Sequence, residues 1–326
     1  MRRIFFVTLF LKGFSVHAQN IFSFNNCIEY TLKHHEQLQI NNNNITIAKE
    51  KVRQAVSDYL PAVSGSVSTI ENIKLQTTVI SAGVLGPTAK DVQFGTKYNS
   101  TAAAAFTQTI YNQGTIATIK ANKLNVELNA LQKTQSEEDL TYNTAAAYFQ
   151  VLIIRAQLKL LYADKANYEA ILTTLEYQLQ KGVVIENDVD RIRVSLNTTQ
   201  YQIEDAISHE KLAMNDLKNA MGMPLDVSLN IKDSIQYESF INPLADDSLK
   251  LEMLTKIKIN QKQVDIQKAN VKIAQASYLP TITAEGKFAT QSLNNDFSKA
   301  FYSWNNYSYI GLSVNIPVFA GFKRRS

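Results

Sequence analysis

Hydrophobic and polar positions change their period several times along this chain, and each change marks the start of a new element. From Ile28 to Leu60 there is no Gly or Pro, and apolar residues recur at intervals of three, four and seven. This spacing predicts one amphipathic helix. Pro61 ends the helix, because proline lacks the amide hydrogen and clashes with the preceding turn.

After Pro61 the side chains alternate with a period of two, which predicts a strand at about residues 62–70. Tyr98–Tyr111 is a second extended segment, beyond a loop that contains Gly and Pro. The two segments are predicted to pair as a hairpin with a long connection. On the first strand the apolar face carries Val63 and Val67, and the polar face carries Ser64, Ser66 and Ser68.

A helical period returns after Gly114. Thr115–Lys181 contains neither Gly nor Pro, and at about 1.5 Å per residue such a helix runs roughly 100 Å. Gly182 interrupts the coiled-coil spacing, and Val183–Met221 then holds the same rhythm. The sequence therefore predicts a long antiparallel helical hairpin over residues 115–221, with its tip near residues 182–188.

The same order then begins again. Residues 226–248 are irregular and are predicted to form a connector, followed by a helix over 249–279 that Pro280 ends. Aligning Ile47–Pro61 with Ile266–Pro280 gives seven identical positions in fifteen, including Tyr-Leu-Pro in both. A duplicated half-subunit explains this match, with a first repeat over 19–225 and an incomplete second repeat over 249–326.

Strands are predicted in the second repeat at about residues 281–290 and 307–317. Both alternate between apolar and polar side chains. The second repeat reaches Ser326 where its own helical hairpin is expected to begin. The apolar positions are Ile282, Phe288, Ile310, Leu312, Val314 and Ile316, and the polar positions are Thr283, Glu285, Lys287, Ser313 and Asn315.

The predicted fold class is α+β, mostly α, with long coiled-coil hairpins and four amphipathic strands. Four strands are too few to close a barrel, and lipid tolerates no open strand edge. Three chains would supply a shared twelve-stranded barrel, with the apolar positions facing lipid and the polar positions facing a wet lumen. An interfacial aromatic belt is predicted from Phe301, Tyr302, Trp304, Tyr307 and Tyr309.

The N-terminus adds a secretory signal to this picture. Arg2 and Arg3 precede the apolar stretch Ile4–Leu11, and Val16-His17-Ala18 resembles a cleavage site. These features predict a signal peptide over residues 1–18. The stretch is too short to span a membrane, and no other window approaches the roughly 20 apolar residues that a spanning helix needs.

Charge and motifs predict no catalytic residue, no cofactor and no metal ligand. The chain has 33 Lys and Arg against 29 Asp and Glu, a net charge of +4 from which no partner follows. No phosphate loop, catalytic triad or carboxylate pair can be assembled, so the protein is not predicted to be an enzyme. His34-His35 is interpreted as a solvated helix start and Cys27 as a packing residue, and Lys323-Arg324-Arg325 is too short to predict nucleic-acid binding.

Three segments carry a family resemblance: the paired Tyr-Leu-Pro turns, Ile-Pro-Val-Phe-Ala-Gly at 316–321, and residues 182–189. In this order and spacing they resemble the TolC-like outer-membrane efflux family. The resemblance implies a homotrimer in the cell outer membrane with helices extending into the periplasm. It also implies a passive export duct, coupled to a periplasmic adaptor (membrane fusion) protein and an inner-membrane pump. The adaptor-docking tip of the family matches Gly182, Val183, Val184, Asp188 and Val189.

Two alternatives stay open. A periplasmic coiled-coil scaffold or adaptor would also contain the long helical hairpin, although it would not need amphipathic strands. A non-functional truncated remnant of an efflux channel would share every pattern above. The exported cargo does not follow from the sequence.

Overall fold

The computed structural model describes residues 21–80, 82–83, 87–232 and 254–318. The chain divides into two compact units, which are described separately. Unit 1 comprises residues 1–42 and 133–250, and unit 2 comprises residues 43–132 and 251–326. The predicted signal peptide, most of the predicted connector and residues 319–326 lie outside the described ranges.

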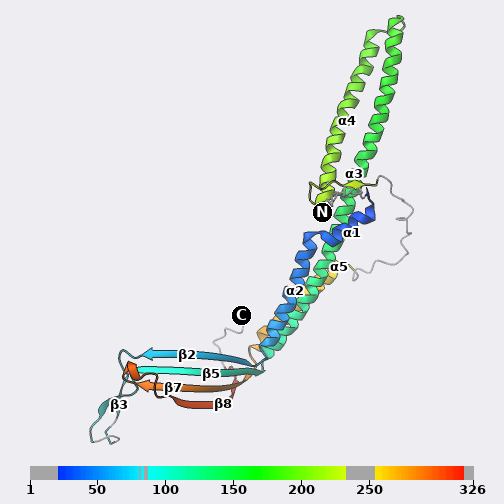
Figure 1. The fold of residues 1–326 in the computed structure, drawn as a ribbon. Helices are drawn as coiled ribbons and strands as arrows, with labels where there is room; N and C mark the ends of the chain where they lie inside the picture. Colours follow the sequence, from blue (N-terminus) through cyan, green and yellow to red (C-terminus); the bar gives the residue numbers. More distant parts are fainter. Residues whose placement is uncertain (1–20, 81, 84–86, 233–253, 319–326) are drawn as a thin grey trace, which may run out of the picture. The chain divides into compact units, whose positions relative to one another are not determined.

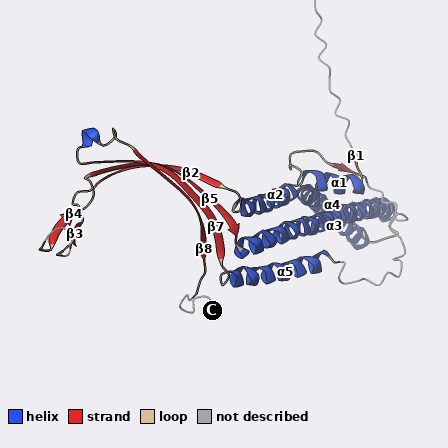
Figure 2. Cartoon of the chain, turned by 90° about the horizontal axis from the view of Figure 1, so that it is seen from below, coloured by secondary structure: helices blue, strands red, loops and turns tan. Residues whose placement is uncertain are grey.

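Unit 2 contains one antiparallel sheet of four long strands in the order β2-β5-β7-β8. They are β2 (Ala62–Glu71), β5 (Tyr98–Tyr111), β7 (Thr281–Asn294) and β8 (Asn305–Asn315). Figure 2 shows these strands as a single curved sheet. All four strands overlap the predicted ranges, although β7 extends four residues further than expected and β8 starts and ends two residues earlier.

The connection between β2 and β5 holds a small hairpin that the sequence pattern did not predict. Its strands are β3 (Thr77–Ile80) and β4 (Lys90–Gln93), which pair antiparallel. Each strand is only four residues long, too short for a reliable alternation. The β7–β8 connection contains the short 3-10 helix η3 (Phe297–Lys299).

Two helices enter the sheet of unit 2 through the same turn. The helix α2 (Glu36–Ser57) and the helix α5 (Thr255–Ala276) both end four residues before a Pro, and a strand starts directly after it. In both turns the Tyr and Leu amides donate to carbonyls three residues earlier. The two Tyr-Leu-Pro segments therefore form the same hydrogen-bonded link, as expected from a duplication.

The long helix α3 (Gln113–Gln180) contributes residues to both units. Within unit 2 its start is tied to the end of α2. The Tyr59 hydroxyl donates to the Asn112 carbonyl at 2.7 Å and accepts from the Asn112 amide at 3.2 Å. The Asn112 side chain in turn accepts from the Gly114 amide at 2.9 Å and caps the helix.

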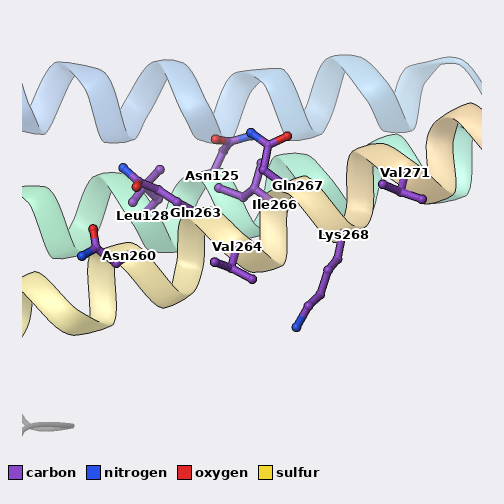
Figure 3. Close-up of a pocket in the computed structure, with 9 residues that line it drawn as sticks. All are labelled: Asn125, Leu128, Asn260, Gln263, Val264, Ile266, Gln267, Lys268 and Val271. Atoms are coloured by element: carbon purple, nitrogen blue, oxygen red, sulfur yellow. The ribbon is translucent and has the colours of Figure 1, made fainter. Parts of the chain in front are cut away.

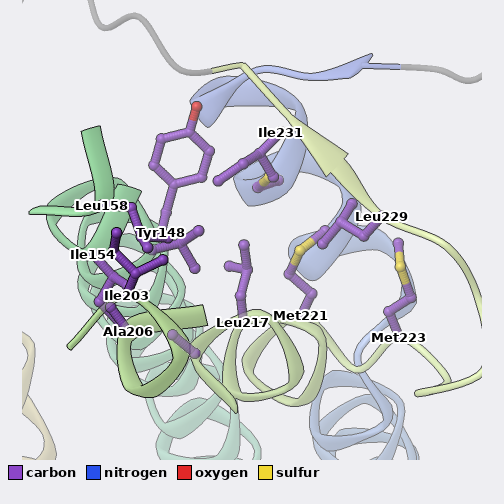
Figure 4. Packing of buried hydrophobic residues seen from close by; sticks show 13 residues of the cluster. Tyr148, Ile154, Leu158, Ile203, Ala206, Leu217, Met221, Met223, Leu229 and Ile231 are labelled. Atoms are coloured by element: carbon purple, nitrogen blue, oxygen red, sulfur yellow. The ribbon is translucent and has the colours of Figure 1, made fainter. Parts of the chain in front are cut away.

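Unit 1 is built around the hairpin of α3 and α4 (Glu186–Met221). The helix α1 (Phe24–His34) and a parallel pair, β1 (Ile21–Phe22) with β6 (Asn230–Ile231), pack on its base. Figure 4 shows the apolar core between them. Tyr148, Val151, Leu217 and Met221 are fully buried there. The Tyr148 hydroxyl satisfies its polar atom by donating to the Lys232 carbonyl at 2.8 Å.

The prediction of one continuous helix over residues 28–60 is wrong at His35. The chain is extended there (ψ 127°), and α2 starts afresh with the Gln37 amide donating to His35 Nδ1 at 3.1 Å. Gly222 lies against this break, where a Cβ on it would come 3.1 Å from His35 Cα. Periodicity could not show the break, because both segments keep a helical period across a single capping residue.

Candidate functional site: the two sheet faces and the hairpin tip

The strand register sorts the sheet into two chemically different faces. Cross-strand partners share a face, so the pairs Val63–Phe106 and Ala104–Phe288 fix the first face through β2, β5 and β7, and Gly286–Ile310 extends it to β8. The predicted apolar positions within strands all lie on this apolar face. They are Val63, Val67, Ile282, Phe288, Ile310, Leu312 and Val314, while Ile316 lies one residue beyond β8.

The opposite face, called the polar face below, carries every strand position that the sequence assigned to a lumen. Thr283 pairs with Ser313, so both lie on this face. Every second residue along each strand returns to the same face. The members from the prediction are Ser64, Ser66, Ser68, Thr283, Glu285, Lys287, Ser313 and Asn315. What each face meets, lipid or water, stays a prediction at this point.

Two features leave the sheet incomplete within one chain. Large apolar side chains are open on the apolar face, with Val67 83% and Ile310 86% exposed. Moreover, β2 and β8 each pair with only one of the described strands and form the two edges of the sheet. Extensive exposed apolar surface marks an interaction site, and unpaired edges invite another strand.

Two of the five members of the predicted aromatic belt conflict with the predicted assignment of the polar face to a lumen. Tyr307 pairs with Ala289 and Tyr309 pairs with Lys287, so both tyrosines lie on the polar face. A lipid-facing belt requires the other face. The alternation in the sequence already indicates the face of these tyrosines, because Tyr309 directly precedes the apolar-face residue Ile310. The remaining three, Phe301, Tyr302 and Trp304, lie before β8 in the β7–β8 connection.

The tip of the α3–α4 hairpin is shaped by a glycine in the left-handed region. Gly182 has φ 71°. Its amide donates to the Leu179 carbonyl at 2.9 Å and the Val183 amide donates to the Gln178 carbonyl at 3.0 Å. This double pattern is the Schellman motif that ends helices at glycine. The predicted turn at Gly182 is therefore observed.

The residues that the family resemblance places in an adaptor-docking tip differ in accessibility. Val183 is 71% exposed, whereas Val184 and Asp188 are half-buried. Val189 is only 1% exposed, so its side chain packs the hairpin and cannot touch a partner. The sequence missed the neighbouring Ile185, which is 64% exposed and completes an apolar tip with Val183.

Two of the charged residues near the tip, Asp190 and Arg193, are paired inside the hairpin. Arg193 of α4 lies 3.3 Å from Glu176 of α3 and 2.8 Å from Asp190. These contacts connect the two helices behind the tip. Asp190 and Arg193 are thus engaged within the chain, whereas the apolar pair Val183 and Ile185 is open to solvent.

The candidate titratable residues Cys27, His34 and His35 each have a packing or capping role in the fold. Burial raises the pKa of the Cys27 thiol to about 12, which keeps it protonated and unreactive in the core of unit 1. His34 stacks on Tyr30 at 4.3 Å between ring centroids, while His35 caps α2. Among the described residues no cluster of His, Cys, Asp and Glu could hold a metal ion, and no helix is long and apolar enough to cross a membrane.

A groove of about 790 Å³, lined by both apolar and polar side chains, runs along α3 and α5 in unit 2. Figure 3 shows Asn125 and Leu128 of α3 beside Gln263 and Ile266 of α5. A salt bridge between Lys262 of α5 and Glu127 of α3 crosses between the same helices. The hydrogen bond to Glu127 raises the pKa of Lys262. An ion pair thus joins the two helices, and the groove beside it leaves space between them.

Comparison with known proteins agrees with this architecture. The family described as Outer membrane efflux protein matches residues 27–223. Outer membrane protein TolC of Vibrio cholerae serotype O1 is 21% identical over 231 residues, which are 66% of this chain and 50% of that protein. Proteases secretion protein PrtF of Dickeya chrysanthemi is 22% identical over 194 residues, 56% of this chain and 40% of that protein. The chain thus spans half, or less, of the length of these relatives.

Solved structures show the same fold at low identity. A crystal structure of CusC aligns with a TM-score of 0.73 and 18% identity, covering 93% of this chain and 67% of that one. The outer membrane protein VceC from Vibrio cholerae aligns with a TM-score of 0.69 and 16% identity, covering 93% of this chain and 70% of that one.

Proposed function

Because the chain belongs to the outer membrane efflux protein family, we propose that it is the outer-membrane channel component of a tripartite efflux or secretion system. The family consists of outer-membrane channel proteins, and the chain is accordingly an outer-membrane protein with helices in the periplasm. In the proposed assembly three copies form one export duct through which cargo diffuses. The duct itself carries out no reaction and needs no cofactor.

The observation that carries the proposal is the two-faced sheet with open edges. Each chain supplies four strands, and in lipid every backbone amide and carbonyl must find a partner. Pairing β8 of one copy with β2 of the next would satisfy both edges, and three copies would close a twelve-stranded barrel. The apolar face would then meet outer-membrane lipid, and the serines and threonines of the polar face would line the lumen.

The α3–α4 hairpin supports the second part of the proposal, docking to a periplasmic adaptor protein and through it to an inner-membrane pump. Its tip presents Val183 and Ile185, both mostly exposed, at a turn fixed by Gly182. A rigid turn with an apolar pair suits recognition by another helical hairpin. Val184 and Asp188 flank this contact, and Val189 supports it from inside.

Assembly and conduction test the proposal together. The full chain should be expressed with its own N-terminus, recovered from purified outer membranes and sized in mild detergent. We expect a trimer that gives stepwise conductance in planar lipid bilayers. Recovery of the chain wholly in the soluble periplasm would contradict the proposal and favour the periplasmic scaffold.

A paired experiment tests adaptor docking separately. Val183→Asp should abolish export in cells while leaving the trimer and its bilayer conductance intact, because the charge is placed on the exposed tip. Val194→Asp on α4, 64% exposed but away from the tip, is the matched control and should export normally. Normal export by Val183→Asp would contradict docking at this tip.

A further inference from the structure

Six residues on the polar face form a two-row patch that the export proposal does not use. In the first row Ala105 pairs with Lys287, which pairs with Tyr309. In the second row Ala103 pairs with Ala289, which pairs with Tyr307. We call these residues the tyrosine–lysine patch. It combines one cation and two phenol rings with three methyl side chains on adjacent strands.

The lysine and one ring are in direct contact. Lys287 Nζ lies 5.8 Å from the centroid of the Tyr307 ring, within the range of a cation–π interaction. Ala289 is 0% exposed, whereas Tyr307 remains 43% and Tyr309 54% exposed. The methyl group of Ala289 is thus already covered, whereas Ala103 and Ala105 are partly exposed and form an accessible apolar floor beside the two rings.

The charge of the patch is nearly isolated on this face. Along the four long strands, the polar face carries two charged residues, Lys287 and Glu285. Glu285 stands two positions along β7, in the row with Thr107 and Gly311, and no ion pair joins it to Lys287 among the described residues. The ammonium can therefore still attract an anion, and Glu285 opposes that attraction from one side.

We propose that the tyrosine–lysine patch binds planar aromatic anions. The aromatic ring would lie on the alanine floor against Tyr307 and Tyr309, and the carboxylate would pair with Lys287. This inference rests on the proposed function for its role: in an assembled channel the patch would be repeated around the lumen and would favour such solutes. Binding is weak and reversible, because a conducting site must also release its solute.

The test uses 2-naphthoate as probe and the full chain in detergent, with ligand-observed NMR titration against empty micelles as blank. We expect saturable binding to the wild type. Lys287→Gln should weaken it about fivefold or more, because the carboxylate loses its cation, and Tyr307→Ser should weaken it similarly. The uncharged 2-naphthylmethanol should bind about fivefold more weakly than 2-naphthoate. Lys258→Gln, an exposed lysine of α5, is the matched control and should bind like the wild type.

Conservative variants separate recognition from folding. Lys287→Arg and Tyr307→Phe keep the charge and the ring and should retain binding, so the inference stays testable even where Tyr307→Ser unfolds. Glu285→Gln should strengthen binding, because it removes the opposing charge. Absence of saturable binding to the wild type, or equal affinity in wild type and Lys287→Gln, would overturn the proposal.

The two proposals fail independently. A trimer that conducts but shows no 2-naphthoate binding would overturn the patch and leave the channel intact. Binding that depends on Lys287 in a chain that gives no conductance would support the patch and contradict the channel. Block of wild-type conductance by 2-naphthoate, relieved in Lys287→Gln, would support both.

Discussion

The two units bury very different side chains, although both contain long helices. Unit 1 has a continuous core of large residues, in which Tyr148, Val151, Leu217 and Met221 are all below 2% exposed. The helices of unit 2 bury mainly methyl groups and a single larger side chain, Ile266, at 9% exposed. The buried alanines are Ala48, Ala55, Ala117, Ala121, Ala269 and Ala276.

This difference indicates which part of the chain can hold itself together. Burial of a large apolar side chain contributes about 1.5–3 kcal/mol, whereas each methyl contributes about 0.8 kcal/mol. Unit 1 therefore gains most of its stability within one chain. In unit 2 the alanines permit close helix approach, but the groove along α3 and α5 and the open face of the sheet leave apolar and polar groups uncovered within one chain, which further copies would cover in the proposed assembly.

The largest effect should come from opening the core of unit 1. Leu217→Ala removes a fully buried side chain of α4 and should lower the free energy of unfolding by about 2–5 kcal/mol. Leu212→Ala on the same helix, 59% exposed, is the matched control and should change it by about 0.5 kcal/mol or less. Thermal unfolding followed by circular dichroism measures both. Equal effects would mean that this cluster does not stabilise unit 1.

A lysine placed on alternate sides of β2 should distinguish the two faces of the sheet. Val67→Lys puts a charge on the apolar face and should cost about 2–4 kcal/mol near the middle of a membrane. Ser66→Lys, one residue away on the polar face, should be tolerated. The measured quantity is the fraction of chain recovered as outer-membrane trimer. Equal loss in both variants would contradict the assignment of Val67 to lipid.

The two Schellman turns of the α3–α4 hairpin differ in their surroundings and should respond differently to alanine. Gly182 and Gly222 have φ 71° and 67°, so a side chain strains either by about 1 kcal/mol. A Cβ on Gly182 meets nothing within 4 Å, whereas one on Gly222 meets the His35 backbone at 3.1 Å. Gly222→Ala should therefore destabilise unit 1 more than Gly182→Ala in thermal unfolding, and the reverse order would contradict the close packing at the α1–α2 break.

Periodicity predicted the long elements because their patterns repeat many times. The helical hairpin follows from apolar positions over many turns, and the strands and their two faces follow from alternations of about seven or eight residues. Features set by one contact were not predictable: the break at His35 depends on a capping hydrogen bond and on Gly222, which is distant in sequence. Likewise the burial of Val189 depends on how α3 and α4 pack. The face of the sheet on which Tyr307 and Tyr309 lie was predictable, because it follows from their alternation with Ile310.

One ion pair in each unit gives the last comparison, and the pair of unit 2 gives the smallest expected effect. Arg155 of unit 1 donates to Glu210 at 2.7 Å and to the Ile231 carbonyl at 3.3 Å, and both charged side chains are less than one-third exposed. Arg155→Gln should therefore cost about 1–2 kcal/mol. In unit 2 the partner of Lys262 is 54% exposed, so Lys262→Gln should cost about 0.5 kcal/mol or less, and high salt should remove even that.

Lys159→Gln, an exposed lysine of α3, sets the baseline in the same thermal unfolding series. Lys262→Gln could instead lower the free energy of unfolding as much as Arg155→Gln does. Polar contacts would then already fix the helices of unit 2 within one chain, and there would be no reason to expect that these helices need further copies.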